Sequence, residues 1–66
     1  MTDLSYNARL ALGAISARRQ FADEARANAM ACGRENDWGS ALRFHHEADQ
    51  HEQIIIAHAQ NLVNAL

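Results

Sequence analysis

The residues best suited to chemistry lie in one segment of the C-terminal half. His45 and His51 stand there among carboxylates, and His58 follows seven residues later. Imidazole and carboxylate groups are zinc ligands, so the segment raises a metal-site hypothesis. On a helix, two ligands converge on one ion when they are three or four residues apart. His45 with Asp49, and Glu47 with His51, meet that spacing.

The same segment departs from the familiar helical metal motifs. His46-Glu47 looks like the start of a zinc-protease motif, but the second histidine is His51, one residue too late. Five residues turn a helix by about 500°, so His46 and His51 diverge. The Glu-x-x-His motif of two-metal carboxylate bundles is absent from the sequence. We expect solvated histidines in ordinary pairs, no metal and no cofactor; a His/carboxylate metal-binding bundle is the less favoured alternative.

Residues for nucleophilic catalysis are also poorly placed. Cys32 is the single cysteine and has no histidine nearby in the sequence. A lone thiol of this kind is typical of a reducing compartment and usually serves as a small buried apolar side chain. The serines occupy helical or capping positions without a base, and no phosphate-binding glycine motif exists. We expect no catalytic residues and no enzymatic activity.

The elements that carry these residues are predicted to be two long helices. The chain has no proline, and its fourteen alanines are spread over both halves, a composition that favours helix. The one break lies at about 33–37. We predict an all-α fold: a helix over about 4–32, a turn, and a helix over about 38–65, forming one antiparallel hairpin domain over 1–66.

Capping residues support these boundaries. Gly33 suits the position after the first helix, because glycine adopts a left-handed backbone without penalty. Asn36 or Asp37 can then cap the second helix, and Thr2 or Asp3 the first.

The apolar surface of the two helices is too wide for a hairpin alone. A core in a chain below about 70 residues rarely supplies more than roughly 3–5 kcal/mol, and each apolar arc exceeds the stripe needed for one neighbour. We therefore predict that two hairpins dimerise into a four-helix bundle; a monomer with a wide arc is the alternative. Ile54 projects away from the arc, as a lone exposed residue or part of a partner site. The predicted dimer and core residues are Leu10, Ile15, Phe21, Trp38, Phe44, Ile55 and Leu62.

Charged residues interrupt both arcs. Folding the chain about residues 35–36 brings Arg26 near Asp49 and Arg19 near Glu52. We predict interhelical ion pairs of Arg26 with Asp49, and of Arg18 or Arg19 with Glu52. Such pairs fix register more reliably than they add stability. An arginine site for a phosphate or acidic ligand is the alternative.

Charge and hydropathy limit the classes of partner that the protein can be expected to bind. The net charge is −2 with neutral histidines, whereas nucleic-acid binders usually carry a basic excess. A nucleic-acid-binding regulator that presents Arg9, Arg34 and Arg43 remains an alternative. The N-terminus lacks the pattern of a secretory signal, and the longest apolar run, 54–57, is far shorter than the roughly 20 residues of a membrane span. We expect a cytoplasmic protein without membrane contact.

Two resemblances add to this picture. Trp38, Ala41, His45 and Ala48 are spaced three, four and three apart, which resembles the second half of a tetratricopeptide hairpin. The turn is longer than in that pattern and no second repeat follows. The resemblance therefore concerns packing and not function.

The segments 17–28 and 34–44 resemble the small helical proteins encoded in the early exo–xis interval of lambdoid phages. That resemblance implies a non-enzymatic accessory protein, made early in infection, which redirects the host or the lysis–lysogeny choice through protein contacts. The family has no catalytic motif to carry over. Together with the predicted dimer, it suggests a homodimeric protein-interaction module, a phage or prophage regulator in the cytoplasm of the bacterial host, with an unidentified protein partner.

Overall fold

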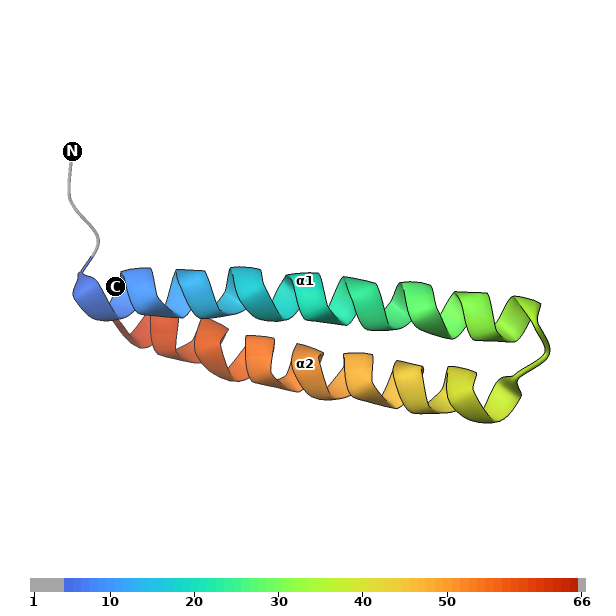
Figure 1. The fold of residues 1–66 in the computed structure, drawn as a ribbon. Coiled ribbons are helices and arrows are strands. Elements are labelled where there is room, and N and C mark those ends of the chain that lie inside the picture. Colours follow the sequence, from blue (N-terminus) through green and yellow to red (C-terminus); the bar gives the residue numbers. More distant parts are fainter. Residues whose placement is uncertain (1–4, 66) are drawn as a thin grey trace.

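Two helices of nearly equal length make up the part of the chain that the computed structural model describes, residues 5–65. Helix α1 spans Tyr6–Arg34 and helix α2 spans Trp38–Ala65. They lie side by side and antiparallel, joined by one short turn (Figure 1). The described residues contain no strand. The predicted all-α hairpin is therefore confirmed.

The N-terminus of α1 is fixed by a serine. The Ser5 hydroxyl accepts a hydrogen bond of 3.1 Å from the amide of Ala8, which satisfies one of the amides that a helix start leaves without a partner. Thr2 and Asp3, the predicted caps, and Leu4, the predicted first helical residue, lie outside the described residues. Within them, α1 begins at Tyr6.

The turn differs from its prediction. Helix α1 continues two residues past the predicted end at Cys32, and Gly33 is helical. Asn36 adopts the left-handed backbone instead, with φ 62°. The amide of Asn36 donates to the carbonyl of Gly33 (3.0 Å), and that of Asp37 to the carbonyl of Cys32 (2.8 Å). This pair of bonds forms a Schellman motif with Asn36 in the position that glycine usually takes.

The start of α2 follows directly from this turn. The Asp37 carboxylate accepts a hydrogen bond of 3.2 Å from the amide of Ser40, so Asp37 is the cap of α2 and Asn36 is not. Hydrogen bonds from the side chain and backbone of Ser40, helped by the charge of Arg43, hold the pKa of Asp37 below its ordinary value. The ionised carboxylate is thus the form that the helix start favours.

Alanine side chains form the whole buried core of the part of the chain that the structure describes. No large side chain among the described residues is fully buried. Short side chains let the two helices pack closely, because interhelical distance follows the size of the residues at the contact. The buried residues are Ala8, Ala11, Ala22, Ala25, Ala29, Ala41 and Ala48.

Candidate functional site

The contact between α1 and α2 follows one regular spacing. We define the seam as the buried and half-buried residues between the helices that recur in alternating steps of three and four residues, the repeat of a coiled coil. On α1 its members are Ala8, Ala11, Ile15, Arg18, Ala22, Ala25, Ala29 and Cys32. On α2 they are Ala41, Phe44, Ala48, His51, Ile55, His58 and Leu62.

Residues beside the seam fall on two opposite faces of the flat hairpin. Met30, Trp38 and Leu42 line a groove on one face, and Phe21 lines a groove with Glu47 on the other. The heptad positions extend both sets along the helices. The Trp38 face comprises Arg9, Leu12, Ser16, Arg19, Asp23, Arg26, Met30, Trp38, Leu42, His45, Asp49, Glu52, Ile56, Ala59 and Val63. The Phe21 face comprises Asn7, Leu10, Ala14, Phe21, Asn28, Glu47, Ile54 and Asn61.

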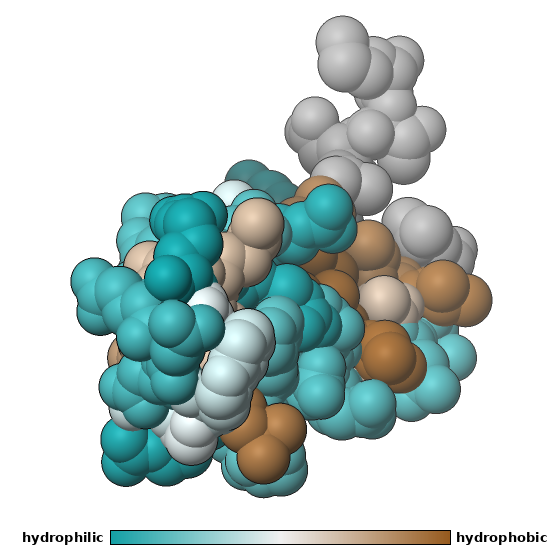
Figure 2. All heavy atoms as spheres, turned by 90° about the vertical axis from the view of Figure 1, so that its right-hand side faces the viewer, coloured by the Kyte–Doolittle hydropathy of each residue, from teal (hydrophilic) through white to brown (hydrophobic). Residues whose placement is uncertain are grey.

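Large apolar side chains are concentrated on the Trp38 face. Viewed from the turn end, hydrophobic residues reach the surface between hydrophilic ones (Figure 2). Among the described residues, nine large apolar side chains are exposed. Leu10 and Phe21 belong to the Phe21 face, and Tyr6 points away from both. The other six, 41–72% exposed, lie on the Trp38 face: Leu12, Met30, Trp38, Leu42, Ile56 and Val63.

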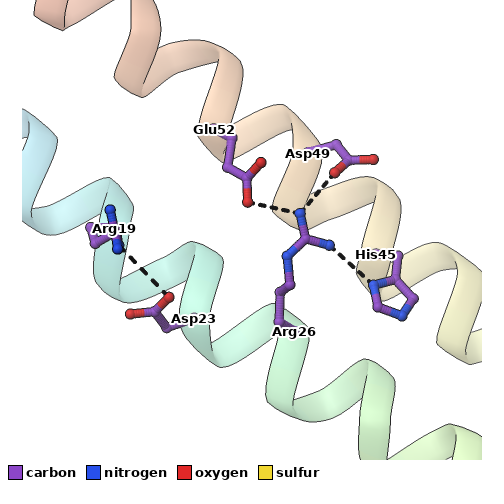
Figure 3. A network of polar contacts seen from close by, with 6 residues as sticks. All are labelled: Arg19, Asp23, Arg26, His45, Asp49 and Glu52. Carbon is purple, nitrogen blue, oxygen red and sulfur yellow. Dashed lines mark hydrogen bonds and ion pairs between the residues drawn. The ribbon is translucent and has the colours of Figure 1, made fainter.

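One arginine links the two helices across the Trp38 face. Arg26 Nη2 donates to Asp49 Oδ1 at 2.9 Å and to Glu52 Oε1 at 2.7 Å. Its Nη1 donates to His45 Nδ1 at 3.1 Å, so the guanidinium of α1 reaches three side chains of α2 (Figure 3). Hydrogen bonds to Glu52 and Asp49 raise the pKa of Arg26 above its ordinary value. The predicted pair of Arg26 with Asp49 is present.

The second predicted ion pair is wrong. Glu52 pairs with Arg26, while Arg19 turns toward Asp23 on its own helix, with Nε 3.9 Å from Oδ1 (Figure 3). Both side chains of that pair are about three-quarters exposed, so it contributes little. Arg18 does not reach a carboxylate either, because it lies in the seam and donates to His51 Nδ1 at 3.2 Å.

His51 lies in the seam and is not solvated as the sequence suggested. Its ring centroid is 5.6 Å from that of Phe21, and its Nε2 lies 3.8 Å from Glu47 Oε1. Because Arg18 can only donate, Nδ1 of His51 must be unprotonated in this contact. His58 is half-buried as well. Among residues 5–65, no group of three or more His, Cys, Asp or Glu side chains is arranged to hold a metal.

The predicted dimer and core residues divide into three sets. Ile15, Phe44, Ile55 and Leu62 are half-buried in the seam. Leu10 and Phe21 are exposed on the Phe21 face, and Trp38 is exposed on the opposite face.

Ile54 and Ile56 lie on different sides of α2. Ile54 is half-buried, whereas Ile56 is exposed. Ile54 stands directly beside the seam on the Phe21 face, and Ile56 is turned by about 200° from it. The prediction that Ile54 projects away from the contact is wrong.

Comparison with known proteins adds no relative. No family model, no curated protein and no solved structure matches the chain. Neither helix, over the residues that the structure describes, has a stretch that is long and apolar enough to cross a membrane.

Proposed function

We propose that this chain is a non-enzymatic protein-interaction module that works as a homodimer, two hairpins joined into a four-helix bundle. One observation carries the proposal. Among the described residues, the buried side chains are alanines, while the leucine, phenylalanine, tryptophan and methionine side chains stay accessible to solvent or half-buried. Apolar surface of this extent on a small protein marks an interaction site.

The shape of the hairpin supports the same proposal. A compact domain of this length has a radius of gyration of about 11 Å, whereas that of the hairpin is 15.2 Å. A single layer 12 Å thick has no inside in which a large side chain can be enclosed. A second layer would supply that inside, because four helices surround a shared core.

The positions of the arginines favour a protein partner over nucleic acid. A nucleic-acid-binding dimer would have to present Arg9, Arg34 and Arg43 as one basic patch. Arg9 lies near the open end of the hairpin, and Arg34 and Arg43 lie near the turn on different sides of their helices. Arg43 also donates to Ser40 at 3.2 Å. These positions do not form a continuous basic surface on one hairpin.

The biological setting rests on the resemblance to small early proteins of lambdoid phages. On that reading, the dimer is a phage or prophage accessory regulator that acts on host or phage proteins in the bacterial cytoplasm. An exposed apolar surface suited to protein contacts agrees with such a role. Capture of a defined host protein by the purified dimer, competed by untagged dimer, is the experiment for this part of the proposal.

Sedimentation equilibrium tests the homodimer directly. At micromolar concentration we expect twice the chain mass of 7.3 kDa, with helicity that falls on dilution. A compact species of single-chain mass that keeps its helicity and melts cooperatively at the same concentration contradicts the proposal.

A further inference from the structure

We infer that the Trp38 face is the surface on which the second copy docks, and that the two turns lie at the same end of the dimer. This inference rests on the proposed function and specifies its interface. The occupant is another copy of this chain, seated with its own Trp38 face against the first.

Apolar side chains stand at both ends of the Trp38 face. Met30, Trp38 and Leu42 surround a groove beside the turn. Ile56 and Val63 line a second groove toward the open end, with Leu12 on the neighbouring helix. The turn-end groove is lined mainly by these apolar side chains, and its one titratable residue is His45. Two anchoring regions are therefore separated by a polar middle.

The size of the face is sufficient for a stable dimer. The hairpin is 51 Å long and 17 Å wide, so one face covers roughly 870 Å² (51 × 17), close to the roughly 800 Å² per partner of a standard interface. The Phe21 face has the same outline, but only two of the large exposed apolar residues, Leu10 and Phe21. The apolar content distinguishes the two faces.

The polar middle carries opposite charges on its two helices. Arg19 and Arg26 stand on the α1 side, and Asp49 and Glu52 on the α2 side. Asp23 is the carboxylate on the α1 side, and it is paired with Arg19. Across the width of the face, a basic edge thus runs beside an acidic one.

This charge pattern selects one of the two symmetric ways to stack the face on itself. A two-fold axis across the hairpin places α1 on α1 and α2 on α2, so like charges meet. A two-fold axis along the hairpin places each α1 on the α2 of the other copy, so the basic edge meets the acidic edge at the same height. Unlike-charge contact steers association and excludes the alternative docking.

The same axis also matches the apolar ends. With both turns at one end, Met30 of one copy meets Leu42 of the other, and the two Trp38 side chains come together near the axis. At the open end, Leu12 of one copy approaches Ile56 of the other. Both apolar regions are covered together with the charged middle, as expected of one self-complementary surface.

A matched pair of variants tests the face. Leu42→Glu changes an exposed leucine of the Trp38 face, and Leu10→Glu an exposed leucine of the Phe21 face. We expect Leu42→Glu to weaken dimerisation at least tenfold, about 1.4 kcal/mol or more, and Leu10→Glu to change it less than about threefold. The reverse order, measured by sedimentation, overturns the inference.

Trp38 supplies a readout that needs no change at the interface. It is the single tryptophan of the chain and is 66% exposed in the hairpin. We expect its emission to move to longer wavelength as the wild-type dimer is diluted into monomers. A dimer whose tryptophan emits like a solvated one overturns the inference about the face but leaves the proposed function intact. A wild-type chain that is monomeric overturns both.

Spin labels test the orientation. The labels are placed at the turn by Glu35→Cys in a Cys32→Ser background. With the two turns together, we expect an interlabel distance well under half of the 51 Å length of the hairpin. A distance close to that full length places the turns at opposite ends and overturns the orientation.

Discussion

Asn36 and Asp37, adjacent in the turn, stabilise different helix ends. Asn36 takes the left-handed backbone that lets α1 stop, and Asp37 caps the first amides of α2. Left-handed backbone is unfavourable for residues with a Cβ, and asparagine tolerates it better than most because its short amide bonds locally. Each residue therefore has a contribution that substitution can separate from that of its neighbour.

Asn36→Ala is expected to lower the free energy of unfolding by about 1 kcal/mol, because alanine has to hold a backbone that costs roughly 1–2 kcal/mol. Asn36→Gly should match or exceed the wild type, since glycine adopts this conformation freely. Urea unfolding followed by circular dichroism measures both. Glu35→Ala is the control, because Glu35 has φ −93°; an equal loss at the two positions contradicts the assignment.

Asp37 makes the stability of the turn depend on pH. Its pKa is lower in the folded chain than its ordinary value of 3.8. Its contribution is therefore complete above that value and is lost as the pH falls through the folded pKa. Asp37→Asn keeps an oxygen for the Ser40 amide but cannot titrate. We expect the difference in stability between wild type and variant to shrink as the solution is acidified below about pH 4; a constant difference contradicts the assignment.

At the scale of the helices, composition was enough to predict the hairpin and its approximate boundaries. Fourteen alanines, the absence of proline and one polar break predict two long helices. The turn could not be placed to the residue. Gly33 has the stronger left-handed preference, but α1 continues through it and Asn36 takes the left-handed backbone instead.

The seam can be recognised in the sequence by its steps of three and four residues, but not on a straight helical projection. A straight helix drifts about 20° per heptad from a 3.5-residue repeat. Over the 29 residues of α1 this drift spreads one narrow seam into a wide arc. Steps of three and four residues separate Ala8, Ala11 and Ile15 from the exposed Leu10 and Leu12. Glu52 pairs with Arg26 and not with Arg19. This pairing depends on the directions of the side chains, which the spacing of residues alone does not predict.

The alanine seam predicts a sharp limit on side-chain size. Ala48 has no exposed surface, so Ala48→Leu must push the helices apart, at a cost of about 1–3 kcal/mol. Ala57→Leu adds the same atoms to an exposed position of the same helix and should change stability by less than about 0.5 kcal/mol. Thermal unfolding of the two variants measures the contrast. Equal tolerance would show that α1 and α2 do not pack through their alanines.

At the scale of the whole molecule, folding and association become one equilibrium. The described residues of the hairpin bury small side chains only. Any molecule that binds the folded state and not the unfolded state stabilises the fold by mass action. For a homodimer the ligand is the chain itself. The melting temperature is therefore expected to rise with protein concentration, by the amount that the dissociation constant sets.

Charge placed in the seam should reveal this coupling. Phe44→Asp and Ile55→Asp each put a carboxylate at a half-buried position, where an unpaired charge is costly. We expect either change to disperse the dimer and to remove most of the helical signal in circular dichroism at micromolar concentration. Gln53→Asp makes the same substitution at an exposed position of α2 and should keep mass and helicity near wild type. A Phe44→Asp or Ile55→Asp chain that is monomeric yet fully helical would show that one hairpin is stable without its partner, because the dimer could then be lost without loss of the fold.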